Sequence, residues 1–427
     1  MRVRELVSIK ETYKEELMKK ANVVGVGIGY KIKGGVRTDI PCIIVFVSKK
    51  LPKACLRTED LIPEELEGIP TDVVESGDFY AYGLEAAARV PYIVLVERER
   101  TERFDPVPVG VSIGNEKITS GTSDILVEDE EGELFTTSNA HVLTSYIARC
   151  ERPERGEKVY QPGRIFGGTP KSNLCARLAG WEPIVPTTIE GDFAWARIRD
   201  DVVEREWVNI LFGLGVGIHS VVSEDDFEPG TAVVSDGLNG VYYGKITSLH
   251  ADVKVHYGCH VKLVRDCIVT TRVGAPGSSG SPLLIESDPG VMIGYLFAGS
   301  STMTAHTPAL KMLAKHGLKL VAAKRRYNPA KVEIEIAVKA VEGRDVILKA
   351  WTDKDEYYSG EEAKVNGWIK DKETENPIAD APIYFYLDEK RLGDTKSDES
   401  GEFEWKFRIP YVPRDTKLKL TVYFPGM

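Results

Sequence analysis

The stretch from residue 107 to residue 320 constrains the fold most, because its apolar residues fall in many short runs with little helical spacing. Gly, Pro, Asn and Asp interrupt these runs at short intervals, and residues of these types are typical of turns between strands. Helical spacing returns only in the segment 308–318. Short strands without intervening helices predict an all-β barrel or sandwich, with one closing helix packed on its outside.

The first hundred residues predict a small α/β unit over residues 1–104. Helical spacing covers residues 9–21. An alternating strand over residues 23–33 then runs through the pair Gly34-Gly35 into a second, apolar strand, which is the pattern of a hairpin. We expect this unit to be structural or regulatory rather than catalytic, because it contains no histidine.

Two glycine patterns, GVGIG at 25–29 and GLGVG at 213–217, superficially match a dinucleotide-binding loop. Such a loop must open a helix whose N-terminus receives the pyrophosphate. Neither pattern is followed by helical spacing, so glycines that allow close strand packing explain both better.

After a basic, Pro-containing joint at 324–331, a third unit is predicted over residues 328–427. Phe403, Trp405 and Phe407 alternate with charged residues, so one face of that strand is expected to be buried and the other wet. The segment YYSGEEAKVNGWIKDKETENPIADAPIYFYL and the following SDESGEF resemble immunoglobulin-like or transthyretin-like modules. The resemblance implies a small β-sandwich, and we expect it to bind a protein partner or support a homo-oligomer.

The composition excludes some classes of function. With 55 Lys+Arg against 65 Asp+Glu, the net charge of −10 lacks the basic excess that binds nucleic acid or an acidic membrane surface. No apolar run approaches the ~18 residues that span a bilayer, and the charged start MRVRELVSIKETYKEEL is unlike a secretory leader, so a soluble, cytoplasmic chain is expected. Gln161 is the only glutamine, a bias that resembles hyperthermophile chains.

The most informative segment is the turn Gly277-Ser278-Ser279-Gly280-Ser281-Pro282. A serine between glycines can present its hydroxyl outward, and flexible glycines let backbone N–H groups point at one spot. A nucleophilic serine needs a base, and the base needs a carboxylate that orients it. His141 is the only histidine before Asp192, and Asp192 begins an alternating strand. The order His141, Asp192, Ser279 therefore predicts a catalytic triad within one unit.

Three segments in this order resemble the chymotrypsin-like (trypsin-like) serine proteases. SNAHV (138–142) stands where that family has TAAHC, GDFAWARI (191–198) where it has a D-I-A-L strand, and GSSGSP (277–282) where it has GDSGGP. GYLFAGSS (294–301) resembles the family's substrate-binding strand. The N-terminal pattern NVVGVGIGYK, joined to such a protease, resembles a group of poorly characterised prokaryotic trypsin-like proteins.

The resemblance implies a double β-barrel protease domain over residues 105–325. The predicted fold class is thus mainly β and multidomain, with the barrels between the N-terminal α/β module and the C-terminal β-sandwich. By resemblance, His141 is the general base and acid, Asp192 holds its tautomer, Ser279 is the nucleophile, and the N–H groups of Gly277 and Ser279 form the oxyanion hole.

Departures from the family pattern concern activation and disulfides. Ser278 stands where zymogen-type members have the Asp that pairs with a newly cut N-terminus, so activation by that ion pair is not expected. Val142 stands where many animal members have a half-cystine. We therefore expect a constitutively formed site without the animal disulfide pattern.

The residues expected to line the substrate pocket are Val273, Ser300 and His306. Val273 lies six residues before the serine, where the trypsin branch has an Asp that pairs with Arg or Lys. A buried valine offers no charge to such a side chain, so the pocket is expected to prefer apolar or small residues. The alternative is that His306 lines the pocket and favours an acidic side chain.

Two histidines and two cysteines between residues 256 and 267 are candidate ligands of a metal site. His256, Cys259, His260 and Cys267 carry zinc-binding groups, but their spacing matches no compact zinc pattern. An ordinary strand pair is the favoured interpretation, a Cys259–Cys267 disulfide is a minor alternative, and no metal or cofactor is predicted. Without a leader peptide, reduced thiols are the default expectation.

The leading functional hypothesis is a serine endopeptidase that works through an acyl-enzyme. The alternative is a pseudoprotease, in which the barrels serve as a scaffold for binding or assembly. An esterase that uses the same site is a third possibility, because the acyl chemistry is shared.

Overall fold

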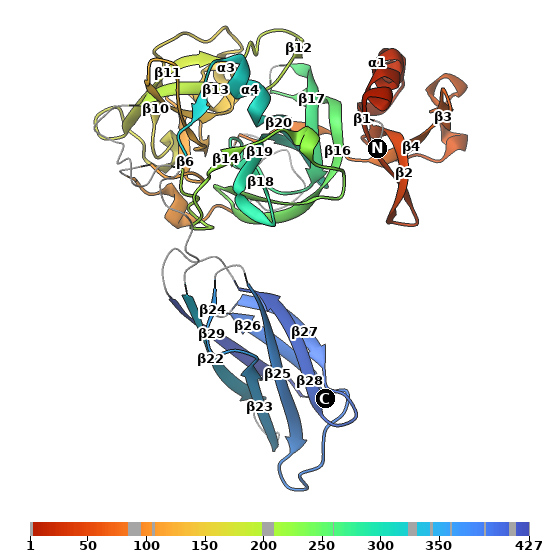
Figure 1. Cartoon of the computed structure of the whole chain (residues 1–427), viewed down its shortest axis with the longest axis vertical. Helices are drawn as coiled ribbons and strands as arrows, with labels where there is room; N and C mark the ends of the chain where they lie inside the picture. The colour runs from red at the N-terminus through yellow and green to blue at the C-terminus, as the bar shows by residue number, and fades with distance from the viewer. Residues whose placement is uncertain are drawn as a thin grey trace. The chain divides into compact units, whose positions relative to one another are not determined.

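The structure is a computed structural model of the 427-residue chain, and Figure 1 shows its elements. It describes residues 3–83, 95–104, 107–198, 209–258, 260–322, 331–341, 345–358, 361–387, 390–409 and 416–426. The chain forms two compact units, residues 1–326 and 327–427. The predicted joint at 324–331 lies almost wholly outside the described residues. As predicted, the fold is mainly β.

The first barrel is built from the residues that follow position 107. Its strands are β6 (Ser112–Asn115), β7 (Gly121–Thr122), β8 (Leu126–Glu128), β9 (Leu134–Ser138), β10 (Lys158–Tyr160), β11 (Leu174–Trp181) and β13 (Ala194–Ile198). The order runs from β6 through β10, β11, β13 and β9 to β8. β7 pairs with β6 and continues along the chain into β8, so the sheet curls back on itself. The short β21 (Lys319–Leu320) adds to β8.

The second barrel is a closed ring of six strands. They are β15 (Ala232–Gly237), β16 (Gly240–His256), β17 (Val261–Thr271), β18 (Pro282–Ile285), β19 (Asp288–Gly299) and β20 (Met303–Pro308). The order is β17-β20-β19-β18-β15-β16, and the pairing of β16 with β17 closes it. β12 (Thr188–Ile189) and β14 (Ser220–Val221) add short parallel pairings. The predicted closing helix is α4 (Ala309–Lys315), which follows β20 directly.

The N-terminal residues extend the sheet of the second barrel. They form α1 (Val3–Lys19), β1 (Val23–Lys33), β2 (Val36–Val47), β3 (Glu65–Leu66), β4 (Ile69–Glu75) and β5 (Phe79–Ala81). β1 pairs antiparallel with β16, and β2, β4 and β3 follow outward (Figure 1). A Cβ on Gly27 would overlap Ser248 of β16, so the glycine pattern GVGIG does serve close strand packing.

Helix α1 begins earlier than its predicted range of 9–21 and ends at Lys19. Leu6 lies on the same buried face as Ile9 and Leu17, so the amphipathic helix begins before residue 9, at Val3. Asn22 has a φ of 70°, a left-handed conformation that a helix cannot continue through. The predicted hairpin at Gly34-Gly35 is confirmed, and both glycines have positive φ as a two-residue turn requires.

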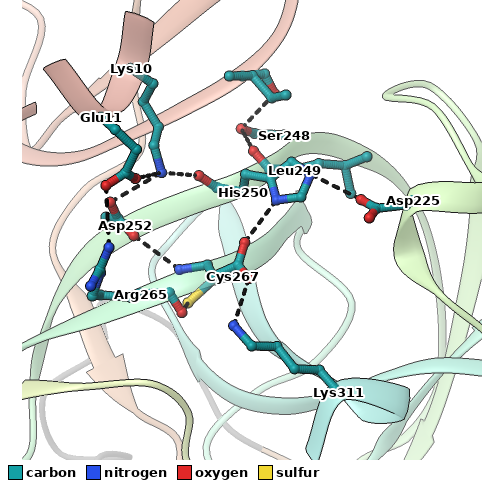
Figure 2. A network of polar contacts seen from close by, with 12 residues as sticks. Lys10, Glu11, Asp225, Ser248, Leu249, His250, Asp252, Arg265, Cys267 and Lys311 are labelled. Atoms are coloured by element: carbon teal, nitrogen blue, oxygen red, sulfur yellow. Dashed lines mark hydrogen bonds and ion pairs between the residues drawn. The ribbon is translucent and has the colours of Figure 1, made fainter. Parts of the chain in front are cut away.

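A buried lysine joins helix α1 to the second barrel (Figure 2). Lys10 is 2% exposed, and its Nζ donates to the His250 carbonyl at 2.8 Å and to Asp252 Oδ2 at 3.1 Å. The other oxygen of Asp252 accepts the Asp266 N–H at 2.9 Å. Lys14 Nζ lies 3.2 Å from Asp252 Oδ2. Helix α1 therefore supplies the positively charged partners of the buried Asp252 carboxylate, which belongs to the barrel.

We expect Lys10→Met to lower the free energy of unfolding of the first unit by about 3 kcal/mol, because it removes one partner of a buried ion pair. Denaturant unfolding measures the change. The control is Lys53→Met, since Lys53 and its partner Glu64 are both exposed, and it should stay within about 0.5 kcal/mol of the parent. Equal effects of the two substitutions would contradict the role of Lys10.

The C-terminal unit consists of two sheets around one core. Strands β22 (Lys331–Ala340), β24 (Tyr357–Tyr358), β26 (Pro382–Leu387), β27 (Lys390–Lys396) and β29 (Thr416–Phe424) form one sheet, and β23 (Val346–Thr352), β25 (Glu362–Asp371) and β28 (Glu402–Arg408) form the other. Phe403 and Phe407 face the shared core, as the alternation predicted. Trp405 stacks on Phe385 of the other sheet at 4.2 Å between ring centroids.

Among the described cysteines, Cys42, Cys55, Cys175 and Cys267 are reduced thiols, as expected. Cys150 is disulfide-bonded, so reduced thiols are the wrong expectation for this residue. Cys267 is a free, buried thiol, which rules out the Cys259–Cys267 disulfide. Cys259 itself lies outside the described residues. Within the part of the chain that the structure describes, no cluster of metal-binding side chains occurs, and no helix is long and apolar enough to cross a membrane.

Candidate active site

Strand pairing in the first barrel brings His141 and Asp192 together. β9 ends at Ser138, and the one-turn helix α2 (Ala140–Leu143) carries His141 directly after it. β13 pairs with β9 so that Ala194 lies opposite Ser138, which places Asp192 beside the start of α2. Asn139 secures this junction, because its side-chain amide donates to the Asp192 carbonyl at 2.8 Å.

The Asp192 carboxylate holds His141 through both of its oxygens. Oδ2 lies 2.6 Å from His141 Nδ1, and Oδ1 accepts the His141 backbone N–H at 3.1 Å. Both side chains are buried. Because a carboxylate can only accept, Nδ1 carries a proton, and in the neutral imidazole Nε2 is then the acceptor. The Asp192 N–H in turn donates to Thr307 Oγ1 at 3.1 Å.

Ser279 reaches this pair from the second barrel. It lies on the turn before β18, where Gly277 and Gly280 have φ values of 106° and 96°. Its Oγ lies 2.7 Å from His141 Nε2 and 3.2 Å from the Phe297 carbonyl oxygen. The structure thus brings His141, Asp192 and Ser279 into one continuous hydrogen-bonded chain, with Nε2 placed to take a proton from Oγ.

The neighbouring serines of the turn point elsewhere. The Ser278 hydroxyl donates to Asn239 Oδ1 at 2.7 Å, and the Ser281 hydroxyl donates to the Ser278 carbonyl at 2.6 Å. Only Ser279 of the three has a hydrogen bond to His141 among the described contacts. The geometry therefore singles out one serine as a possible nucleophile.

An aromatic residue covers the imidazole from the second barrel. Tyr257 meets His141 edge to face, with 6.0 Å between ring centroids. Burial raises the pKa of Tyr257 well above its ordinary value, and the nearby Asp192 carboxylate adds to the shift. Tyr257 thus stays neutral and helps to keep water from the His141–Asp192 pair.

The predicted oxyanion donor Gly277 already has a partner. Its N–H donates to the Tyr82 carbonyl oxygen at 2.6 Å. Tyr82 is fully buried, its N–H donates to the Phe297 carbonyl at 2.9 Å, and its hydroxyl donates to the Ser300 carbonyl at 2.7 Å. The sequence analysis missed this residue. No local signal could have found it, because every one of these partners lies far along the chain.

The remaining predicted pocket residues are both buried. Val273 is fully buried, and its N–H donates to Thr304 Oγ1 at 3.2 Å. His306 Nε2 lies 3.0 Å from Thr270 Oγ1 and 3.2 Å from Thr304 Oγ1. Burial lowers the pKa of His306 to about 3, so the ring is neutral near pH 7. His306 is fully buried, and the alternative that it favours an acidic side chain stays a prediction.

Comparisons with known proteins cover different parts of the chain. A family model described as the NARROW LEAF 1 N-terminal domain matches residues 2–75. No curated protein matches the chain at a significant level.

Among solved structures, the chain is similar to three protease structures over 50% of its own length. One is a glutamic acid specific serine protease that uses a novel histidine triad in substrate binding (19% identity, 100% of that chain, TM-score 0.37). Another is Cellulomonas bogoriensis chymotrypsin (21% identity, 98% of that chain, TM-score 0.36). The third is Nocardiopsis protease, NAPase (15% identity, 99% of that chain, TM-score 0.36).

We expect Gly280→Ala to cost at least about 3 kcal/mol of stability, because it combines a left-handed backbone with a clash. A Cβ at this position would overlap Ser138 Oγ and the Thr122 carbonyl. The control is Gly132→Ala, which has a similar φ of 80° but open space around it and should cost only about 1–2 kcal/mol. Thermal unfolding of both variants measures the difference, and similar losses would show that the turn is not tightly packed.

Proposed function

We propose that the protein is a serine endopeptidase that cleaves peptide bonds through an acyl-enzyme. The observation that carries the proposal is the hydrogen-bonded chain from Ser279 Oγ through His141 to Asp192, with links of 2.7 and 2.6 Å. A serine hydroxyl is a weak nucleophile unless a positioned base takes its proton, and this arrangement supplies the base and the group that orients it.

The chain's own groups account for each proton transfer. Ser279 Oγ attacks the substrate carbonyl while His141 Nε2 takes the hydroxyl proton, and Asp192 stabilises the imidazolium that forms. His141 then gives the proton to the leaving amine. In the second half, water attacks the acyl-enzyme with His141 as base, and Ser279 regains its proton.

The oxyanion hole is assigned to the N–H groups of Gly277 and Ser279. The positive φ of Gly277 turns its N–H towards the space where a substrate carbonyl would lie, as its bond to the Tyr82 carbonyl illustrates. Fixed N–H donors of this kind act on the charge that develops in the transition state. A carbonyl oxygen that enters this position meets a donor without any rearrangement of the turn.

The second candidate function is a scaffold with an unproductive triad. Tyr82 favours it, because its backbone carbonyl, from the chain's own N-terminal residues, accepts the Gly277 N–H, and its side chain is buried against the second barrel. An intact His141–Asp192 pair favours the enzyme, because a scaffold has no need of a buried, fully hydrogen-bonded imidazole. An esterase would use the same groups as the peptidase.

We expect a fluorophosphonate probe to label Ser279, and Ser279→Ala to abolish labelling and lower kcat by about 10⁶-fold, because the three residues act as a unit. Peptide mapping after labelling and hydrolysis of a chromogenic peptide with an aromatic residue before the cut are the measurements. The matched control is Ser278→Ala, which should retain the label because its hydroxyl is turned to Asn239.

Two results would contradict the proposal. The first is a label on Ser278 or unchanged turnover in Ser279→Ala, which would refute the assignment of the nucleophile. The second is the absence of any label both in the parent chain and in Tyr82→Ala, where the adjacent space is vacated. That result would favour the scaffold.

A further inference from the structure

A short N-terminal strand lies against the strand expected to bind substrate. β5 pairs antiparallel with β19, with Ala81 opposite Ala298 and Tyr80 opposite Gly299. Its other edge pairs in parallel with β16. β16 and β19 are not neighbours in the ring of the second barrel, so β5 joins two strands that have no other direct pairing. An extended segment added to a free strand edge is a common way for proteases and other domains to bind peptide.

Residue 82, which follows this strand, is aligned with the catalytic serine. The Phe297 carbonyl oxygen accepts the Tyr82 N–H at 2.9 Å and lies 3.2 Å from Ser279 Oγ. The Tyr82 carbonyl oxygen accepts the Gly277 N–H at 2.6 Å. The carbonyl of residue 82 is therefore bonded to the assigned oxyanion donor, and its N–H is bonded to a carbonyl that also lies beside the assigned nucleophile, which is the pattern expected of a bond that is to be cut.

The side chain of Tyr82 fits a slot that the barrel provides. Its ring is fully buried and lies over Gly299, where any Cβ would overlap the ring and its hydroxyl. The hydroxyl donates to the Ser300 carbonyl at 2.7 Å, and Val273 belongs to the same apolar cluster. The Tyr82 side chain is thus buried in an apolar cluster and meets a hydrogen-bond acceptor at its tip, an environment that suits an aromatic side chain with a polar end.

We infer that residues 79–82 occupy the substrate site of this protein as a tethered peptide, and that the protein cuts its own chain between Tyr82 and Gly83. The inference rests on the proposed function. It also names the substrate class: extended peptides with an aromatic residue immediately before the cut.

The reaction balances with water as the only co-reactant. Ser279 Oγ bonds to the Tyr82 carbonyl carbon as its proton moves to His141, and the Tyr82–Gly83 C–N bond breaks as His141 protonates the Gly83 nitrogen. Water then attacks the ester while His141 takes one of its protons and returns it to Ser279 Oγ. The products are a carboxylate at Tyr82 and a new amino terminus at Gly83.

The cut does not by itself release the N-terminal piece. β1 stays paired with β16, and Lys10 stays bound to Asp252, because neither contact involves the cleaved bond. A freshly cut chain should therefore remain one particle under native conditions and separate into two polypeptides only when it is denatured.

The first test compares the parent chain with Ser279→Ala by mass spectrometry under native and denaturing conditions. We expect the parent to give two polypeptides that meet at Tyr82 and Gly83 after denaturation, and the variant to stay intact. Cleavage at another bond, or the same cleavage in Ser279→Ala, would overturn the inference.

A second pair of variants separates this inference from the proposed function. Tyr82→Ala should accept fluorophosphonate at Ser279 at least tenfold faster than intact chain, whereas the control Tyr243→Ala, at a 45% exposed tyrosine of β16, should not change the rate. If Tyr82→Ala is labelled and hydrolyses an aromatic peptide while the parent chain stays intact on prolonged incubation, self-cleavage is overturned and the peptidase stands. If no variant is labelled, both are overturned.

Two further substitutions of Tyr82 distinguish a loss of cleavage from a loss of folding. Tyr82→Phe keeps the ring and loses only the hydrogen bond to Ser300, so self-cleavage should persist at a rate within about tenfold of the parent. Tyr82→Asp places a charge in an apolar slot, so cleavage should be lost. Equal cleavage of the two variants would overturn the assignment of Tyr82 to the specificity pocket.

Discussion

The hydrogen bond between Ser279 Oγ and His141 Nε2 requires the two barrels to meet in a single arrangement, because each barrel supplies one of the partners. Thr122 of the first barrel maintains that arrangement through its backbone and its side chain. Its N–H donates to the Ser279 carbonyl at 2.7 Å, and its hydroxyl donates to the Gly277 carbonyl at 2.8 Å. The Leu238 N–H donates to the same hydroxyl at 3.1 Å. The turn that carries Ser279 is thus positioned by buried contacts of Thr122 rather than by the hydrogen bond to His141 alone.

The N-terminal residues depend on the same barrel and contribute to it in return. β1 extends the sheet from β16, and Lys10 of α1 compensates the buried Asp252 on that strand. β5 then crosses to β19 and brings Tyr82 to the site. The N-terminal segment, which the sequence suggests is a separate module, therefore adds strands to the sheet of the second barrel. It also supplies the cation that pairs with Asp252, and it places Tyr82 beside the candidate site.

The three candidate residues could be proposed from the sequence because each occupies a short window with its own chemistry: a histidine after a strand, an aspartate before one, and a serine between glycines. The mainly β class followed from alternation and turn residues for the same reason, as Phe403 and Phe407 illustrate. Tyr82 could not be found in this way. Its role depends on Phe297, Gly277 and Ser300, which come near it only when β5 pairs with β19, and pairing between distant strands leaves no local pattern. The free thiol of Cys267 likewise depends on distances in the folded chain.

Under the proposed function, occupation of the site by the chain's own segment changes how any other substrate must bind. The N–H of Gly277 carries one proton, so a second peptide cannot use it while the Tyr82 carbonyl does. A tethered segment competes at an effective concentration on the order of millimolar, which a dilute free peptide does not reach. Cleavage after Tyr82 removes the covalent tether on one side only, since β5 remains joined to β1, and β1 remains paired with β16. Access therefore depends on whether β5 leaves β19, a step that breaks the Tyr82 contacts while the N-terminal sheet stays in place.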